Sequence, residues 1–439
     1  MKKKVFPRAF ALLLVGALAA SALPASAAGA DLTRGQFVSA LWEQSGKPSA
    51  EEAAPFTDVR SGDKNYTAIL WAAGCGVVSG DGKGAFFAGE PITREQAAVM
   101  LLNYAAASGD GVIASADLSS CADAGAVSPW ALEAVQWAVA KSLLSAEDGR
   151  LDPKGPLSAG EAAALVDRYE RTSQHFHSIG LTGVENARQL GGYVTADGRT
   201  VKDGVLLRTG KLSGATDADL ARLREVYNLT AVVDFRTTAE IAQGPDPAME
   251  GVSNTQINIL GDDDASTGAV TGIYGADPIQ AIIDIAKSGQ FGADMYASFL
   301  SSERGLAGYR QFFQALLNQK EGAILWHCTG GKDRAGTAAV LLLSALGVDR
   351  ETVLQDFALT NDFNAQKILY MGAQAADRGE SAGVVELVRT LTGVNYDYMA
   401  AMLDMIDAQY GSMDAFLTAA DGMALTAGQL AQLREMYLD

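Results

Sequence analysis

A short segment in the second half of the chain combines a cysteine, an arginine and several glycines at a spacing suited to binding an anion. Residues 323–337 read AILWHCTGGKDRAGT, and an apolar run follows them. The apolar pattern and the glycines predict a buried strand, a tight loop and a buried helix. The N–H groups of such a loop, at the start of a helix, attract negative charge. Arg334 adds a planar fork that matches two phosphate oxygens.

The cysteine that opens this loop is placed to act as a nucleophile. The dipoles and cations that bind an anion also stabilise a thiolate, so Cys328 is expected to be reactive at neutral pH; the alternative is a small buried apolar residue. The loop lacks the Gly-Lys-Ser/Thr ending of nucleotide-binding loops. No metal or other cofactor is expected, because the chain has 3 His and two of them, His175 and His177, stand in a polar stretch that reads as a linker.

Several segments together resemble the cysteine-dependent protein-tyrosine phosphatases. His327 and Cys328, followed by five residues and Arg334, match the signature of that superfamily. The KDR sequence within the loop is similar to the bacterial branch that also accepts phosphoinositides. The resemblance covers about residues 178–439, and it implies an α/β domain with a central sheet flanked by helices. The other segments that resemble this branch are 186–193, 197–199, 207–210, 232–236 with Glu240, 356–361, and the ending from 410–412 to 437–438.

The resemblance also implies a role for each residue of the loop. Cys328 would attack phosphorus and form a phosphocysteine intermediate, while Arg334 and the loop N–H groups would hold the oxygens whose charge grows in the transition state. Lys332 would add positive charge, and His327 would orient the loop and tune the thiolate. The substrate-binding residues implied are Thr329, Gly330, Gly331, Lys332 and His327.

The general acid that protonates the leaving group is a separate question. The resemblance favours Asp333 within the loop, and Asp234 at a predicted strand end is either an assisting residue or an ion-paired structural one. Residues 257–264 read as a strand-like stretch followed by an acidic run, which offers an alternative acid, although a solvated loop is the preferred interpretation. Arg236 with Glu240 is interpreted as structural.

One departure from the family pattern bears on turnover. The residue after the loop arginine is usually Ser or Thr, whose hydroxyl stabilises the departing thiolate, but here it is Ala335. Either Thr337 or Thr329 takes over this role, or hydrolysis of the phosphoenzyme is slow.

The first part of the chain contains an internal repeat that would form a second binding surface. LTRGQ at 32–36 and ITREQ at 92–96 are two copies, and LSAGE at 157–161 is a weaker third. Each contains a Thr or Ser that can cap a helix, with Gln or Glu three residues later. A second shared element, at 56–59 and 121–124, leads to a Trp-Ala pair. The repeating unit is therefore helix, Gly-rich loop, helix.

These elements resemble the S-layer homology module, and they cover residues 31–172 as two and a half repeats. The resemblance implies an all-α region that binds a secondary cell-wall polysaccharide, with Arg34 and Arg94 lining the pocket; the third copy lacks this arginine. The alternative is a helical repeat in which the Thr-Arg pairs only cap helices. Trp71 and Trp137 are expected in the core rather than in a sugar site.

The amino-terminal end of the chain reads as a secretory signal. Residues 1–27 have a basic start, an apolar run and an Ala-Ser-Ala cleavage site, and no later stretch is long and apolar enough to span a membrane. Export permits a disulfide between Cys75 and Cys121, which their spacing leaves open.

Composition limits the partners of the protein. The net charge of -18 disfavours nucleic acid, and the 48% hydrophobic content can fill the cores of two or three folding units. We therefore predict a secreted, cell-wall-associated phosphatase that hydrolyses phosphomonoesters, with phosphotyrosine preferred. The alternatives are a phosphoinositide or inositol phosphate phosphatase, and a wall-associated protein that traps phosphorylated ligands with little turnover.

Overall fold

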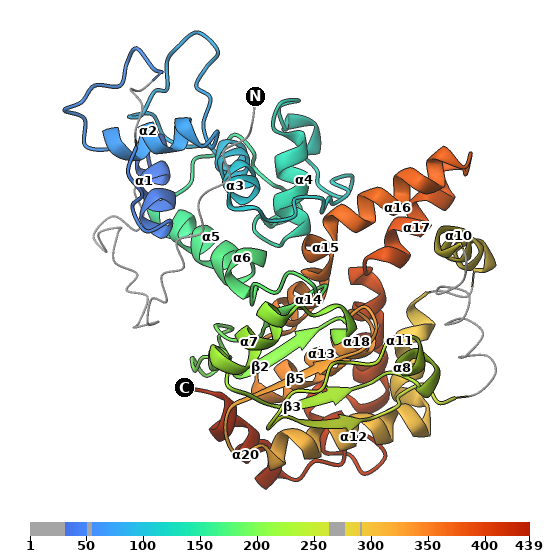
Figure 1. Cartoon of the computed structure of the whole chain (residues 1–439). Coiled ribbons are helices and arrows are strands. Elements are labelled where there is room, and N and C mark those ends of the chain that lie inside the picture. The colour runs from blue at the N-terminus through green and yellow to red at the C-terminus, as the bar shows by residue number, and fades with distance from the viewer. Residues whose placement is uncertain (1–30, 51–54, 263–276, 290–291) are drawn as a thin grey trace. The chain divides into compact units, whose positions relative to one another are not determined.

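The computed structural model describes residues 31–50, 55–262, 277–289 and 292–439 (Figure 1). The chain divides into two compact units within the short helix α6 (Gln174–His177), between His175 and Phe176. Among the described residues, no helix is both long and apolar enough to cross a membrane. The expected signal at 1–27 lies outside the described residues.

The first unit is a helical repeat. As predicted, α1, α3 and α5 each follow a complete capping box, in which two side chains satisfy backbone N–H groups at the helix start. Trp71 and Trp137 are buried in its core, also as predicted. The structure forms no disulfide between Cys75 and Cys121. The helices of this unit are α1 (Arg34–Gln44), α2 (Tyr66–Gly74), α3 (Arg94–Ser108), α4 (Leu132–Ala140) and α5 (Ala159–Arg171), with a short 3-10 helix at Ala124–Ala126.

A ring of backbone hydrogen bonds joins the three copies of the repeat. The N–H of Leu32 donates to the carbonyl of Leu157 (2.8 Å), and the N–H of Leu157 donates to the carbonyl of Ile92 (3.0 Å). The ring closes through the N–H of Ile92, which donates to the carbonyl of Leu32 at 2.8 Å. All three side chains are buried. Since each residue directly precedes a capping Thr or Ser, the ring fixes the starts of α1, α3 and α5 relative to one another.

The two histidines that we expected in a polar linker are packed instead. The Nδ1 of His175 lies 3.0 Å from Asp110 Oδ2, and its Nε2 lies 3.1 Å from Glu170 Oε2. His177 is fully buried in the second unit and stacks on Tyr193, with ring centroids 4.4 Å apart. The linker prediction is wrong for these residues because the polar sequence around them gives no sign of their contacts with Asp110 and Tyr193.

The second unit is built on a mostly parallel sheet. β1 runs antiparallel to β2, and the other neighbouring strands are parallel. Thr209 and Asp234 both pair with His327, so three strands end at one edge. Ligands of open α/β sheets bind outside this carboxyl edge. The strands are β1 (Arg188–Gln189), β2 (Leu206–Thr209), β3 (Leu229–Asp234), β4 (Ser253–Gln256) and β5 (Ala323–His327), in the spatial order β1-β2-β5-β3-β4.

Helices flank this sheet, which confirms the predicted α/β class (Figure 1). Successive residues of a strand point to opposite faces. Ile324 and Trp326 thus join a large core with α12, α13 and α18, whereas Ala323 and Leu325 join a smaller core beside α7. The helices are α7 (Asp217–Glu225), α8 (Thr238–Gln243), α10 (Pro278–Ser288), α11 (Ala293–Ser301), α12 (Glu303–Asn318), α13 (Arg334–Leu346), α14 (Arg350–Ala358), α15 (Thr360–Phe363), α16 (Ala365–Asp377), α17 (Ala382–Thr392), α18 (Tyr396–Tyr410), α19 (Met413–Thr418) and α20 (Ala427–Tyr437), with a 3-10 helix at Leu212–Gly214.

The edge strand β4 differs from the expectation. It consists of four exposed polar residues, whereas the apolar Ile257 and Ile259, which we expected to form a strand, lie just beyond its end. The N–H of Ile257 still donates to the carbonyl of Asp234 at 2.8 Å. An edge strand whose side chains are all exposed has no alternating apolar pattern, so its position cannot be predicted from the sequence.

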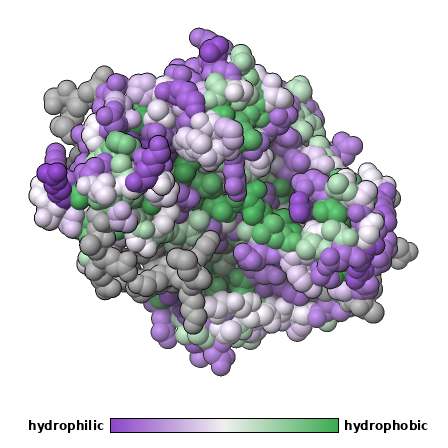
Figure 2. All heavy atoms as spheres, turned by 90° about the horizontal axis from the view of Figure 1, so that it is seen from above, coloured by the Kyte–Doolittle hydropathy of each residue, from purple (hydrophilic) through white to green (hydrophobic). Residues whose placement is uncertain are grey.

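Large apolar side chains reach the surface at several positions among the described residues. Figure 2 shows hydrophilic residues over much of the visible face, with apolar residues among them. The exposed large hydrophobic residues among those described are Phe87, Trp130, Leu132, Val226, Leu369, Tyr370 and Leu387.

Candidate active site

The cysteine loop connects β5 to α13 at the carboxyl edge of the sheet, in the predicted order of strand, loop and helix. Cys328 is 2% exposed. Gly331 has a φ of 65°, and a Cβ at this position would collide with the carbonyl group of Thr209 on β2. The loop can therefore adopt this shape only with glycine here.

The carbonyl groups of the loop are tied to its surroundings. The carbonyl of Thr329 accepts a backbone N–H at 3.0 Å, and that of Gly331 accepts from the buried side chains of Asn186 and Arg208, both at 2.9 Å. In the part of the chain that the structure describes, the N–H groups of residues 329–334 have no acceptor. Because N–H and carbonyl point in opposite directions in a trans peptide, these N–H groups are left to bind an anion at the start of α13.

Arg334 is held by one edge of its guanidinium. Its Nη1 donates to Glu240 Oε2 and its Nη2 to Glu240 Oε1, both at 2.6 Å, and Nη1 also donates to the carbonyl of Phe235 at 3.1 Å. The Nε hydrogen and the second Nη2 hydrogen have no acceptor among the described residues. These two donors form a fork of the geometry that binds two phosphate oxygens.

Glu240, which we interpreted from the sequence as structural, pairs with the arginine of the loop. Burial would raise the pKa of its carboxyl, but the hydrogen bonds and charge of Arg334 lower that pKa to about 2. The Thr329 hydroxyl also donates to Glu240. Burial would lower the pKa of Arg334, yet Glu240 and the charge of Cys328 raise it above its ordinary value. Glu240 and Arg334 are 94 residues apart in sequence, so no local pattern reveals the pair.

Asp333 is partly exposed, with 23% of its side chain accessible. Its Oδ1 accepts a hydrogen bond from the hydroxyl of Tyr296 at 2.7 Å, and its Oδ2 lies 3.9 Å from Lys332 Nζ. Burial and then the charge of Asp333 raise the pKa of Tyr296 well above its ordinary value, so the hydroxyl stays a donor. This fixes Oδ1 of Asp333, while Oδ2 accepts no hydrogen bond from the described residues.

Lys332 directs its ammonium group away from the loop. It donates to the carbonyl of Gly393 at 2.9 Å and to that of Leu391, at the end of α17. Its charge therefore compensates the carbonyl end of the α17 helix dipole.

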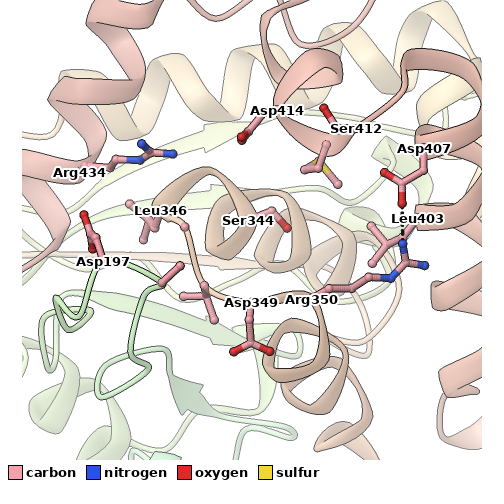
Figure 3. A pocket seen from close by; sticks show the side chains of 14 residues that line it. Asp197, Ser344, Leu346, Asp349, Arg350, Leu403, Asp407, Ser412, Asp414 and Arg434 are labelled. Carbon is pink, nitrogen blue, oxygen red and sulfur yellow. Dashed lines mark hydrogen bonds and ion pairs between the residues drawn. The ribbon is translucent and has the colours of Figure 1, made fainter.

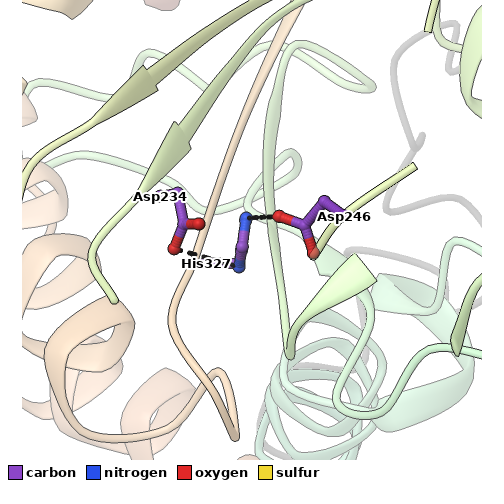
Figure 4. A group of neighbouring side chains, drawn as sticks. All are labelled: Asp234, Asp246 and His327. Carbon is purple, nitrogen blue, oxygen red and sulfur yellow. Dashed lines mark ion pairs between the residues drawn. The ribbon is translucent and has the colours of Figure 1, made fainter. Parts of the chain in front are cut away.

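His327 and Asp234 belong to an ion network behind the loop (Figure 4). His327 Nδ1 lies 3.1 Å from the carbonyl oxygen of Cys328, and its Nε2 lies 3.0 Å from Asp246 Oδ2. Arg236 binds both carboxylates, at 2.8 Å for Asp234 and 2.7 Å for Asp246. The two carboxylates and the imidazole are close enough to ligate a metal, but the guanidinium already occupies the position of a cation. The geometry thus favours the ion-paired interpretation of Asp234.

Thr329 and Thr337 lie in different surroundings. We considered both as replacements for the hydroxyl that usually follows the loop arginine. Thr329 is committed to Glu240. Thr337 is fully buried one turn into α13, close to the hydroxyl of Tyr309, which donates to the carbonyl of Arg334 at 3.1 Å.

The acidic run 262–264, which we considered as an alternative source of the general acid, begins beside the start of α8. The carboxylate of Asp262 accepts from the N–H and the hydroxyl of Thr238, at 2.9 and 3.0 Å, at the start of α8. Residues 263 and 264 lie outside the described residues. Asp262 therefore has a structural partner of its own.

A separate pocket of about 500 Å³ lies at the other end of α13 (Figure 3). Ser344 and Leu346 of this helix line it together with charged side chains. One of these, Arg350, is paired with Asp407 at 2.7 Å. Because α13 has 13 residues, the pocket is about 20 Å from the cysteine loop.

A groove of about 690 Å³ in the first unit brings an arginine beside exposed aromatic rings. The Nε of Arg34 donates to the carbonyl of Phe86 at 2.9 Å, and the Nε of Arg94 donates to that of Leu151 at the same distance. The two repeats thus use their motif arginine in the same way. The sequence did not reveal the two aromatic residues, because neither belongs to the repeated motif. The groove residues in question are Arg34, Phe87 (48% exposed) and Trp130 (59% exposed).

Comparison with known proteins gives both units a family. Residues 55–98 and 122–163 match the S-layer homology domain, which indicates association with the cell surface. A tyrosine-protein phosphatase of Cupriavidus necator is 33% identical over 268 residues, covering 60% of this chain and 89% of the relative. The triple specificity protein phosphatase PtpB of Mycobacterium tuberculosis is 29% identical over 261 residues, covering 54% of this chain and 91% of that protein.

A third relative is a tyrosine-protein phosphatase of Nostoc commune, which is 28% identical over 220 residues, covering 48% of this chain and 67% of the relative. The tyrosine phosphatase family itself matches residues 179–439, which include the loop, Glu240 and the whole sheet. The anion-binding loop headed by Cys328 is therefore that of a phosphatase, and the chain belongs to the tyrosine phosphatase family.

Proposed function

We propose that this protein is an exported, cell-surface phosphatase that hydrolyses phosphotyrosine through a phosphocysteine intermediate. The observation that carries the proposal is the set of loop N–H groups without acceptors beside the two free donors of Arg334, all next to Cys328. These donors suit the three oxygens of a phosphoryl group, whose charge they stabilise in the transition state.

The reaction then follows two steps at phosphorus. The Cys328 thiolate forms a P–S bond as the P–O bond to the leaving group breaks, and Asp333 gives its proton to the departing oxygen. In the second step a water molecule attacks phosphorus, the P–S bond breaks, and the proton of the water passes to Asp333. His327 orients the loop from behind, and the N–H groups of residues 329–332 hold the phosphoryl group.

Two alternative functions would use the same cysteine loop. Phosphoinositides or inositol phosphates are the substrates that the family resemblance of the KDR sequence in the loop implies, although the Lys332 ammonium is bound to carbonyl groups of α17. A relative named for triple specificity supports a site that accepts more than one class of substrate. A trap for phosphorylated ligands is supported by Ala335, because a missing hydroxyl slows release of the thiolate from the phosphoenzyme.

For the first unit we propose binding to a secondary cell-wall polysaccharide. The groove beside Arg34 supports this, since aromatic rings and an arginine suit a polymer with apolar sugar faces and anionic groups. Arg94 lies at the equivalent position of the next repeat.

Phosphate release from phosphotyrosine, phosphoserine and phosphothreonine peptides and from phosphoinositides tests the enzymatic proposal. The protein without its leader is compared with Cys328→Ser under reducing conditions with chelator. Release that requires Cys328 supports the mechanism, and the preferred substrate separates the protein and lipid alternatives. A folded protein that binds vanadate but releases phosphate from none of them would leave only the trap.

A further inference from the structure

A buried arginine lies directly against the anion-binding loop. Arg208, the third residue of β2, is fully buried. Its Nη2 donates to the carbonyl of Gly331 at 2.9 Å and lies 3.5 Å from that of Lys332. Asn186 donates to the same Gly331 carbonyl at 2.9 Å. Two side chains thus hold one peptide of the loop in its orientation.

A single carboxylate fixes Arg208 from the other side. Asp356 on α14 accepts from Arg208 Nη1 at 2.9 Å and from Arg188 Nε at 3.2 Å, and the Tyr193 hydroxyl donates to it at 3.2 Å. Arg188 also bonds Asn186. Three of the sequence segments that share the family resemblance therefore meet in one network beneath the loop.

This network carries an excess of positive charge. Arg188, Arg208 and Asp356 are all fully buried, so two guanidinium groups face one carboxylate. Burial and the charge of Arg188 lower the pKa of Arg208 to about 10, while the charges of Asp356 and Cys328 raise it. Arg208 is thus charged at neutral pH. Buried charge without a counter-charge is costly, and the negative charge of Cys328 is one that acts favourably on Arg208.

Resting on the proposed function, we infer that Arg208 is a positioning residue for the phosphatase reaction. It keeps the carbonyl groups of Gly331 and Lys332 turned outward, so that the N–H groups that follow them face the phosphoryl oxygens. Its buried charge stabilises the Cys328 thiolate before the reaction and the phosphoryl group during it. Asp356 holds the guanidinium of Arg208 in place, and Asn186 holds the peptide of Gly331 in the same orientation.

The test separates charge from shape with two variants. Arg208→Met removes the charge and both loop contacts, whereas Arg208→Lys keeps the charge but loses the fork. The matched control is Arg434→Met, since Arg434 also donates to a main-chain carbonyl, that of Ala345 at 2.9 Å, but at the other end of α13. The variants are made in a Cys75→Ser, Cys121→Ser background, so that iodoacetamide reports only on Cys328.

Three quantities are measured for each protein: the alkylation rate against pH, the affinity for vanadate, and kcat and KM. For Arg208→Met we expect the alkylation midpoint to rise by about one pH unit, hence an alkylation rate about tenfold lower at acidic pH, with weaker vanadate binding. For Arg208→Lys we expect a midpoint near that of the parent and a kcat/KM about tenfold lower. Arg434→Met should change thermal stability alone.

A folded Arg208→Met protein with the parent's alkylation midpoint and vanadate affinity overturns the inference. If that variant does not fold, Arg208→Lys and Asn186→Ala decide: the parent's kcat/KM and vanadate affinity in both would equally overturn it. Failure of the proposed function looks different, because the parent protein itself would then release no phosphate while the alkylation and vanadate measurements still report on Arg208.

Discussion

Asp333 and Arg334 are adjacent in the chain, but they contact different residues, so the separate roles that we propose for them can be tested apart. Asp333→Asn should lower kcat/KM about a hundredfold for aryl phosphates with poor leaving groups and little for those with good ones, because only a poor leaving group needs a proton. The measurement is kcat/KM across a series of aryl phosphates. Asp234→Asn, in the Arg236 ion pair, serves as the control and should leave the leaving-group dependence unchanged; a steeper dependence there would give Asp234 the acid role.

Glu240 should matter both to catalysis and to acid stability. Glu240→Gln is expected to lower kcat/KM at least tenfold, since Arg334 loses the partner that orients its free edge. The pKa of Glu240 is lowered from 4.5 to about 2, so its stabilising effect is complete above about pH 4.5 and is lost as the pH falls towards 2. The melting temperatures of wild type and variant should therefore converge on acidification.

The control for this prediction is Glu386→Gln, which breaks an exposed pair with Arg389 in the same unit. Exposed pairs contribute little to stability. Melting curves of the control that match those of Glu240→Gln at every pH would contradict the role given to the buried pair.

The residues of the loop could be predicted because the chemistry is contiguous in the chain. Cys328, Asp333 and Arg334 lie on or beside one short loop, so their spacing alone predicts an anion site. Glu240 and Tyr296, which orient Arg334 and Asp333, arrive from other elements through the fold. Nothing in their local sequence distinguishes them from a helix-capping acid and a core aromatic residue.

At the scale of elements, the close approach of β2 to the loop makes Gly331 a sensitive position. Gly331→Ala should abolish vanadate binding and activity, because its Cβ would meet the Thr209 carbonyl and its positive φ is unfavourable for alanine. Isothermal titration with vanadate measures the effect. Gly330→Ala offers the comparison, since its Cβ would meet nothing nearer than the Lys332 side chain at 3.5 Å; an equal loss in both would argue against steric exclusion.

Elements were predictable where a pattern had a physical cause. The capping boxes of the repeat and the strand-loop-helix of the cysteine segment depend on residues close together in sequence, so they were found. β4 was misplaced because an exposed edge strand has no apolar alternation, and its hydrogen bonds to β3 come from a segment about twenty residues earlier.

At the scale of the whole molecule, the two units have separate hydrophobic cores. Calorimetry should therefore resolve two unfolding transitions, of which vanadate raises only the one that belongs to the phosphatase unit, because a ligand stabilises the unit that binds it. A single transition that shifts as one with vanadate would show that the units unfold together.

His175 supplies the corresponding probe for the first unit. Its two carboxylate partners outweigh burial and raise its pKa from 6.5 to about 10. The stabilising effect is then complete below about pH 6.5 and is lost as the pH rises through about 10. His175→Gln should lower the melting temperature of the first unit at pH 6 and have little effect on it near pH 10. A difference in melting temperature between variant and wild type that stays constant with pH would show that the stabilisation does not come from the charge of His175.

Cys328 has a consequence for how the enzyme tolerates oxidants. It is the sole cysteine of residues 176–439, and the other two belong to the first unit. A thiolate that is oxidised to sulfenic acid is commonly rescued by a second thiol nearby. Within its own unit Cys328 has none, so recovery after peroxide depends on a small thiol from solution or on attack by a neighbouring backbone nitrogen. For a protein at the cell surface, the thiol content of the surroundings would then set how long the activity lasts.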